Sequence, residues 1–178
     1  MTDRSIEKLA QRFRDAIESA KHDHAFDKSS CFTNFPTGCC GNTSYLLAEY
    51  LLRAGIETIW VSLNRNDGSH AWLVLKDRRV KEPQKTILPA EYTDIISQYR
   101  NQNFEEETED IHYVEQDLRD GLIIDITSDQ FDDYKKPVFV GQMDDFHQSF
   151  DFIQAVDYDG LKNDRLEHLY EIIESYIY

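Results

Sequence analysis

The spacing of apolar residues changes at Gly55, and this change constrains the fold of the chain more than any other feature. Before it, residues 6–20 and 45–54 place apolar side chains three and four positions apart, which is the period of an amphipathic helix. Gly55 stands where the second helix would end. After it, residues 58–63 and 71–75 are rich in β-branched and aromatic residues, as strands are. Helices followed by strands in this order predict an α+β domain.

Later segments add further helices and strands. Asn-Asp-Gly at residues 66–68 indicates a hairpin between the two strand runs, with a connection longer than two residues. The further predictions are a helix at 89–99, an acidic loop at 101–110 with a weak helix following it to 118, strands at 121–126 and 137–140, and a helix at 161–178. We therefore expect one domain over residues 1–178, with N-terminal helices packed on an antiparallel β-sheet.

The chain is strongly acidic, because 34 Asp and Glu against 19 Lys and Arg give a net charge of −15. Nucleic acids and anionic membranes bind positively charged surfaces, so the charge argues against both as main partners. We interpret the excess acid as solvated surface, with a site for a basic partner as the alternative. No apolar run approaches the ~20 residues of a membrane span, and the first residues lead directly into a charged amphipathic pattern. These features predict a soluble cytoplasmic protein.

Three cysteines, Cys31, Cys39 and Cys40, make a poor disulfide framework because an odd number leaves one thiol unpaired. A reducing compartment fits them better, and a free thiol there can carry out chemistry. We interpret Cys39 as a packing residue, although a vicinal disulfide or redox pair with Cys40 stays open. Cys31 is either a redox partner or a residue without a chemical role.

Cys40 is the first candidate for chemistry, because Gly38-Cys39-Cys40 stands at the start of the second predicted helix. Unpaired backbone N–H groups and the helix dipole favour a thiolate at that position, and the same N–H groups can stabilise an oxyanion. Gly38 lets the backbone approach closely before the nucleophile. The alternative is a buried cysteine that acts only as a small apolar residue.

His70 and Asp125 are the next candidates. His70 opens a predicted strand, where a side chain is held rigidly and can face a cleft; the alternative is an ordinary histidine at a sheet edge. Asp125 interrupts the apolar strand 122–126, and a buried carboxylate requires a hydrogen-bonding partner, for which an imidazole is well suited. The alternative is an acid that caps the end of the strand.

Cysteine on a helix, then histidine and aspartate on successive strands, resembles the papain-like cysteine enzymes and, within them, the transglutaminase-like branch. The resemblance lies in three short segments, 38–40 with Ser44, 70–72 and 125–127, which match Gly-x-Cys, His-Ala-Trp and Asp-x-Thr. It implies a papain-like core of the kind found in small bacterial members. It also implies Cys40, rather than Cys39, as the nucleophile, His70 as the general base and Asp125 as the residue that orients it. Asn34 is the nearby polar amide that could donate to the oxyanion, as the family's upstream Gln or Trp does.

The implied activity is thiol-dependent acyl transfer on a protein or peptide substrate, by hydrolysis, deamidation or cross-linking, without a cofactor. Arylamine acetyl transfer is a second enzymatic interpretation. The alternative outside catalysis is an inactive papain-like scaffold that serves as an acidic protein-binding or immunity module. A homodimer through tyrosines near residues 170–178 is a further alternative to simple packing of the last helix.

Other patterns point less clearly to function. His22-Asp23-His24 could hold a metal, but we interpret it as plain loop and expect no metal site. Asp129 and Gln130 could line the cleft, but a turn after the strand is the favoured interpretation. The acidic residues 105–110 are interpreted as a solvated loop, with a cover over the cleft as the alternative.

Overall fold

The computed structural model describes residues 2–177 except 67, 78, 82 and 88–108. Its main elements are three long helices and a five-stranded sheet in the order β6-β5-β2-β1-β7, in which all neighbouring strands are antiparallel. The long helices are α1 (Asp3–His22), α2 (Cys40–Arg53) and α6 (Asp164–Glu174). The strands of the sheet are β1 (Thr58–Arg65), β2 (Gly68–Leu75), β5 (Ile123–Asp125), β6 (Phe139–Gly141) and β7 (Asp151–Asp157).

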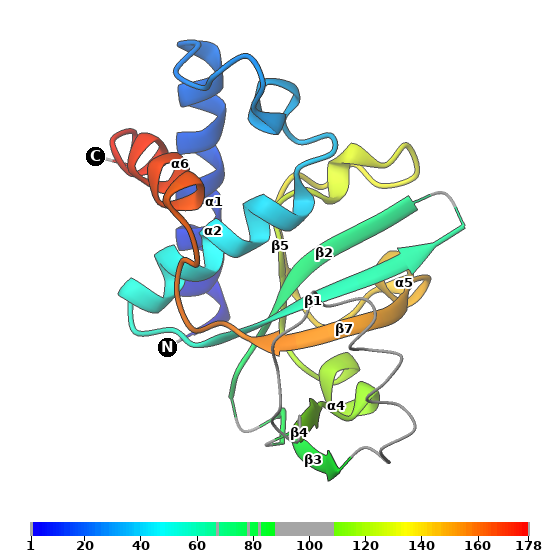
Figure 1. Ribbon diagram of the computed structural model, residues 1–178. Coiled ribbons are helices and arrows are strands. Elements are labelled where there is room, and N and C mark those ends of the chain that lie inside the picture. Colours follow the sequence, from blue (N-terminus) through cyan, green and yellow to red (C-terminus); the bar gives the residue numbers. More distant parts are fainter. Residues whose placement is uncertain (1, 67, 78, 82, 88–108, 178) are drawn as a thin grey trace.

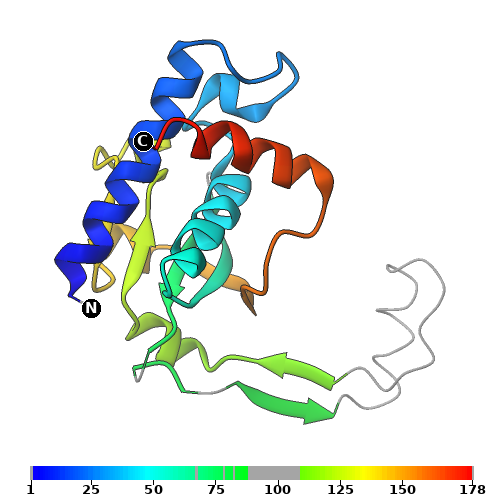
Figure 2. The same ribbon diagram turned by 90° about the vertical axis from the view of Figure 1, so that its left-hand side faces the viewer.

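Shorter elements complete the described chain. They are η1 (Cys31–Asn34), α4 (Glu115–Arg119), η2 (Ser128–Gln130), α5 (Asp145–Gln148) and the paired strands β3 (Gln84–Ile87) and β4 (Glu109–His112). The β3–β4 pair projects away from the helices and the main sheet (Figure 2). No helix among the described residues is long and apolar enough to cross a membrane.

The three long helices gather on one side of the sheet, where they enclose the larger hydrophobic core (Figure 1). The apolar stripe of α1 is buried there, as its spacing predicts. A second core lies on the other face of the sheet and is built on Ile59, Val61, Trp72 and Val74. Strand residues alternate between the two faces of a sheet. Leu73 therefore belongs to the helix-side core, while its neighbours Trp72 and Val74 belong to the second core.

The β1–β2 hairpin is confirmed, but its connection is shorter than expected. The register runs from Thr58–Leu75 to Arg65–Gly68, which leaves two residues between the strands. Backbone pairing therefore continues past both apolar runs into polar residues, since ladder hydrogen bonds do not depend on apolar side chains. Gly55, with φ +75°, follows the C-cap residue Ala54 of α2, which is the position where a helix end favours glycine.

The α+β class, the antiparallel sheet and the N-terminal helices are confirmed. The weak helix, the two later strands and the last helix appear as α4, β5, β6 and α6, each shorter than predicted. The helix predicted at 89–99 lies outside the described residues, as does most of the acidic loop at 101–110, whose last two residues belong to β4. Strands β3, β4 and β7 and helix α5 were not predicted.

Candidate active site

Cys40 is the first residue of α2, so its sulfur lies at the positive end of a helix of 14 residues. Gly38 has φ +71°, a conformation that side chains disfavour, and it turns the chain into the helix. The first turn of α2 is fixed to the sheet by Ser44, whose Oγ lies 2.6 Å from the carbonyl oxygen of Cys40 and 2.9 Å from that of Ala71 in β2. The start of the helix and the start of the strand are therefore held together.

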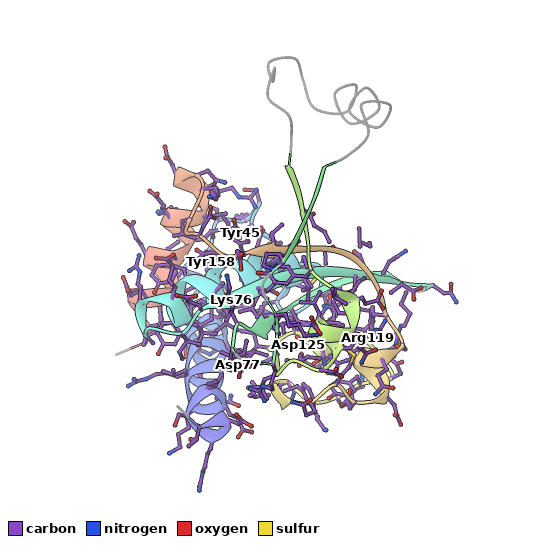
Figure 3. All side chains as sticks on the ribbon, turned by 90° about the horizontal axis from the view of Figure 1, so that it is seen from below. Tyr45, Lys76, Asp77, Arg119, Asp125 and Tyr158 are labelled. Atoms are coloured by element: carbon purple, nitrogen blue, oxygen red, sulfur yellow. The ribbon has the colours of Figure 1, made fainter. Side chains whose placement is uncertain are left out.

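His70 and Asp125 meet across the neighbouring strands β2 and β5. Nε2 of His70 lies 2.7 Å from Oδ2 of Asp125, and both side chains are fully buried. The backbone N–H and the hydroxyl of Thr127 donate to the other carboxylate oxygen, Oδ1, at 2.9 and 3.3 Å. Asp125 lies among packed side chains inside the molecule (Figure 3). The buried carboxylate thus has the imidazole partner that the sequence predicts.

The electrostatics of the three side chains favour a thiolate–imidazolium pair. Burial opposes the charge on His70, but the charge of Asp125 and its hydrogen bond outweigh burial and raise the pKa of His70 to about 9. Burial likewise opposes the thiolate of Cys40, yet a hydrogen bond and the charge of His70 lower the pKa of the thiol below its usual value. The pKa of Asp125 is held far below its usual range, because His70 and His147 together overcome the cost of burial.

Gln130 is a fourth residue at the site, beside Cys40, His70 and Asp125. The sequence did not establish that Gln130 contacts these residues. Its Oε1 accepts from the backbone N–H of Gly38 at 3.3 Å, and its Nε2 lies 3.1 Å from Nδ1 of His70. Because a backbone N–H can only donate, the contact with Gly38 turns the NH₂ group toward the imidazole. Gln130 also contributes to the low pKa of the Cys40 thiol through a hydrogen bond. The segment forms the 3-10 turn η2, as the favoured interpretation expects, and within it Gln130 contacts His70.

Asn34 occupies a different position. It is the last residue of η1 and is exposed to solvent. Among the described residues, no hydrogen bond joins its side chain to Cys40 or His70. Gln130 is the side-chain amide that the structure brings to the imidazole.

Arg14, on the buried face of α1, fixes the segment that links Asp125 to Gln130. Its guanidinium donates to both carboxylate oxygens of Asp129 at 2.8 Å and to the carbonyl oxygens of Ile126 and Pro137 at 2.6 and 2.8 Å. Bidentate pairing of this kind sets direction as well as distance. Sequence reasoning missed Arg14, although a charged residue inside an apolar helical stripe requires a buried partner.

The remaining cysteines lie on the other side of the start of α2. Sγ of Cys39 donates to the carbonyl oxygen of Pro36 at 3.1 Å, and Cys39 belongs to the helix-side core, in agreement with a packing role. Cys31 lines a cavity of about 260 Å³ together with Arg165 and His168. The neighbouring Cys39 thiol and a hydrogen bond from the amide of Asn42 lower the pKa of the Cys31 thiol, while the proximity of Cys31 together with burial raises the pKa of Cys39.

No group of three or more His, Cys, Asp or Glu side chains that could hold a metal ion occurs in the described part of the chain. At the segment His22-Asp23-His24, His22 is highly exposed and its Nδ1 lies 3.1 Å from a carboxylate oxygen of Asp23. This pairing of neighbours fits the interpretation of the segment as ordinary surface.

No protein-family model matches the chain, and searches of curated proteins and of solved structures gave no significant match. The resemblance to papain-like enzymes therefore stays a prediction, and the function has to be argued from the geometry of the site.

Proposed function

We propose that the protein is a thiol-dependent acyl-transfer enzyme with a papain-like, transglutaminase-like core, acting on a peptide or other amide. The observation that carries this proposal is the fully buried contact of 2.7 Å between His70 and Asp125, with Cys40 at the start of α2, where the same imidazole lowers the pKa of its thiol. A nucleophile, a base and a group that orients the base are the parts that such chemistry requires. This complete set favours an enzyme over an inactive binding scaffold.

In the resting site the thiol proton of Cys40 lies on Nδ1 of His70, as a thiolate–imidazolium pair. The thiolate attacks the carbonyl carbon of the substrate, and a C–S bond forms as the carbonyl π pair moves onto oxygen. The backbone N–H groups at the start of α2 stabilise that oxyanion. The C–N bond then breaks, the leaving amine takes the proton from Nδ1, and a thioester remains on Cys40. Water or a second amine attacks the thioester carbonyl while His70 takes its proton, and the C–S bond then breaks, which releases the acyl product and restores the thiolate–imidazolium pair.

Gln130 is the side-chain donor that we propose for the oxyanion, in place of Asn34. While Nδ1 of His70 is unprotonated, the NH₂ group of Gln130 can donate to it at 3.1 Å. Once Nδ1 carries the proton from Cys40, it no longer accepts, and the NH₂ group is free to turn to the developing negative charge. In the thiolate–imidazolium pair this donor is therefore free for the oxyanion.

The test uses p-nitrophenyl acetate, a small activated ester that needs no specific binding site. We expect a burst of p-nitrophenol together with one acetyl group on Cys40, detected by mass spectrometry. Because Lys28 and Arg53 flank all three cysteines without another basic residue between them, trypsin leaves the thiols on one peptide, and fragmentation must locate the label.

The comparison is made in a Cys31→Ser background, because the Cys31 thiol also has a lowered pKa. We expect Cys40→Ala to abolish the burst and His70→Ala to slow it by about 10²- to 10⁴-fold. Acetylation of Cys39 instead, or an equal burst in Cys40→Ala, would refute the assignment of the nucleophile. No acylation of any thiol would leave the binding scaffold as the better interpretation.

A further inference from the structure

A second buried imidazole, that of His147, faces the carboxylate of the proposed site. His147 belongs to α5 and is fully buried, and its Nε2 lies 3.4 Å from Oδ2 of Asp125, the same oxygen that His70 contacts at 2.7 Å. Its other ring nitrogen, Nδ1, lies 2.5 Å from Oδ1 of Asp144. The hydroxyl of Tyr134 donates to Oδ2 of Asp144 at 2.8 Å. One imidazole therefore lies between two carboxylates.

This arrangement specifies where the protons of His147 lie. Asp144 accepts from Nδ1, so Nδ1 carries a proton. Among the described residues, nothing donates to Nε2, and the group that faces it is the carboxylate of Asp125. An unprotonated Nε2 would place a lone pair against a negatively charged oxygen in the buried interior, whereas a protonated one would place positive charge 3.4 Å from that oxygen.

The surrounding aromatic rings also suit a cation. The ring of Phe139 stacks on His147 with centroids 4.4 Å apart and planes inclined by 28°. Trp72, Tyr134 and Phe146 close the other sides at centroid distances of 5.1 to 5.5 Å. Faces of aromatic rings attract positive charge, and a buried charge needs such compensation in addition to its ion pairs.

We propose that His147 is a positioning residue that acts through Asp125: as an imidazolium held by Asp144, it shares Oδ2 of Asp125 with His70. The charge state of His147 is independent of the proposed function, and only its role in catalysis rests on that function. Among the described residues, the titratable and charged groups around this imidazole are Asp144, Tyr134, Asp125 and, across Asp125, His70, with Lys136 over the rings of Tyr134 and Phe139. The positive charge of His147 offsets part of the negative charge that His70 experiences from Asp125.

The consequence for the reaction concerns the proton that His70 must return to the leaving amine. An imidazole that binds its proton too tightly is a poor acid, and the best acid has a pKa near the working pH. By offsetting Asp125, His147 limits how tightly His70 holds its proton. Thr127 already fixes the other oxygen of Asp125, so loss of His147 changes the charge beside His70 more than the position of the carboxylate.

The first measurement needs no variant and no substrate. In uniformly ¹⁵N-labelled protein at about pH 7, we expect the two ring nitrogens of His147 to show the shifts of an imidazolium. Shifts typical of a neutral ring with an unprotonated Nε2 would overturn the proposal, whatever the outcome of the acylation test.

The second measurement is the pH titration of His70 in His147→Phe, which keeps a planar ring in the aromatic cluster. The two Nε2 atoms contact one oxygen and so lie within about 6 Å of each other, where a unit charge changes proton affinity at least about tenfold. We expect the pKa of His70 to rise accordingly. The matched control is His22→Phe, because His22 is highly exposed and far along the chain from Asp125.

An unchanged titration of His70 in a folded His147→Phe protein would overturn the inference. If that variant does not fold, His147→Gln takes its place with the same expectation, since its amide carries no charge. Absence of acylation by p-nitrophenyl acetate, with a cationic His147 and a shifted His70, would refute the proposed function and leave this inference standing.

Discussion

Replacing Asp125 by asparagine removes the charge that holds the His70 proton and changes little else in shape. Asp125 is 1 % exposed, and its contact with His70 measures 2.7 Å. The charge of this carboxylate does most to raise the pKa of His70, and burial of the imidazole lowers it. In Asp125→Asn burial remains, so the pKa of His70 should fall from about 9 to its usual 6.5 or below.

The size of the effect follows from these two values. A fall from about 9 to 6.5 is a loss of about 300-fold in proton affinity, or about 3 kcal/mol. Near pH 8, His70 would change from mostly protonated to mostly neutral. Cys40 would then lose the cation that lowers the pKa of its thiol, and its thiolate fraction near pH 7 would fall.

The assay is the rate at which iodoacetamide alkylates Cys40 near pH 7, in the Cys31→Ser background, with the pH titration of His70 followed by NMR. We expect the rate to fall by at least about tenfold and by as much as about 300-fold. Asp120→Asn is the matched control, because Asp120 is exposed and follows α4. An unchanged rate together with an unchanged His70 titration would refute the reasoning that Asp125 sets the charge state of the imidazole.

Three further predictions test other parts of the structure. The raised pKa of His70 contributes to the free energy of unfolding fully below about pH 6.5, and this contribution is lost as pH rises through about 9, whereas the lowered pKa values of the Cys31 and Cys40 thiols act in the opposite direction; in a Cys31→Ser, Cys40→Ala protein, denaturant unfolding should therefore show a decline over that range, which addition of Asp125→Asn abolishes. Asp129→Ala should lower the free energy of unfolding by about 3 kcal/mol, because it leaves the buried charge of Arg14 without its bidentate partner. Urea unfolding measures this change, and a loss below about 1 kcal/mol would contradict the explanation. In the native protein, iodoacetamide should label Cys31 and Cys40 well before the buried Cys39, and equal labelling of all three thiols would contradict the assigned environments.

Elements with a buried face could be predicted from the sequence, because burial imposes the period of the structure on the apolar residues. This holds for α1, α2 and the β1–β2 hairpin. Strand β7 escaped prediction because it is an edge strand that pairs only with β1 and keeps few of its side chains buried; Ile153, for example, is 64 % exposed. An edge strand depends on backbone pairing, which leaves little trace in the side-chain pattern.

Of the four predicted site residues, the three that meet at the site, Cys40, His70 and Asp125, each lie at a defined place on a regular element, at a helix start or on a strand, whereas Asn34 ends a 3-10 turn elsewhere. Gln130, by contrast, lies in a 3-10 turn and contacts His70 across 60 positions of sequence. Its place depends on Arg14, which pairs with Asp129 across 115 positions. Turn residues carry no periodic signal that indicates which of them faces a site.

A charged residue on the apolar stripe of α1 carries a signal that sequence reasoning missed. Arg14 lies between the buried residues Phe13 and Ala16, whereas His147 lies in the mostly polar segment Asp-Phe-His-Gln of α5, where only the fold shows that it is buried. In each case a group that is costly to bury without a partner occupies a buried position, which requires an opposite charge nearby. The partner of Arg14 is the turn that carries Gln130, and the partner of His147 is the carboxylate that orients His70. Polar residues in apolar settings therefore indicate the groups that hold this site in place, although only the fold identifies their partners.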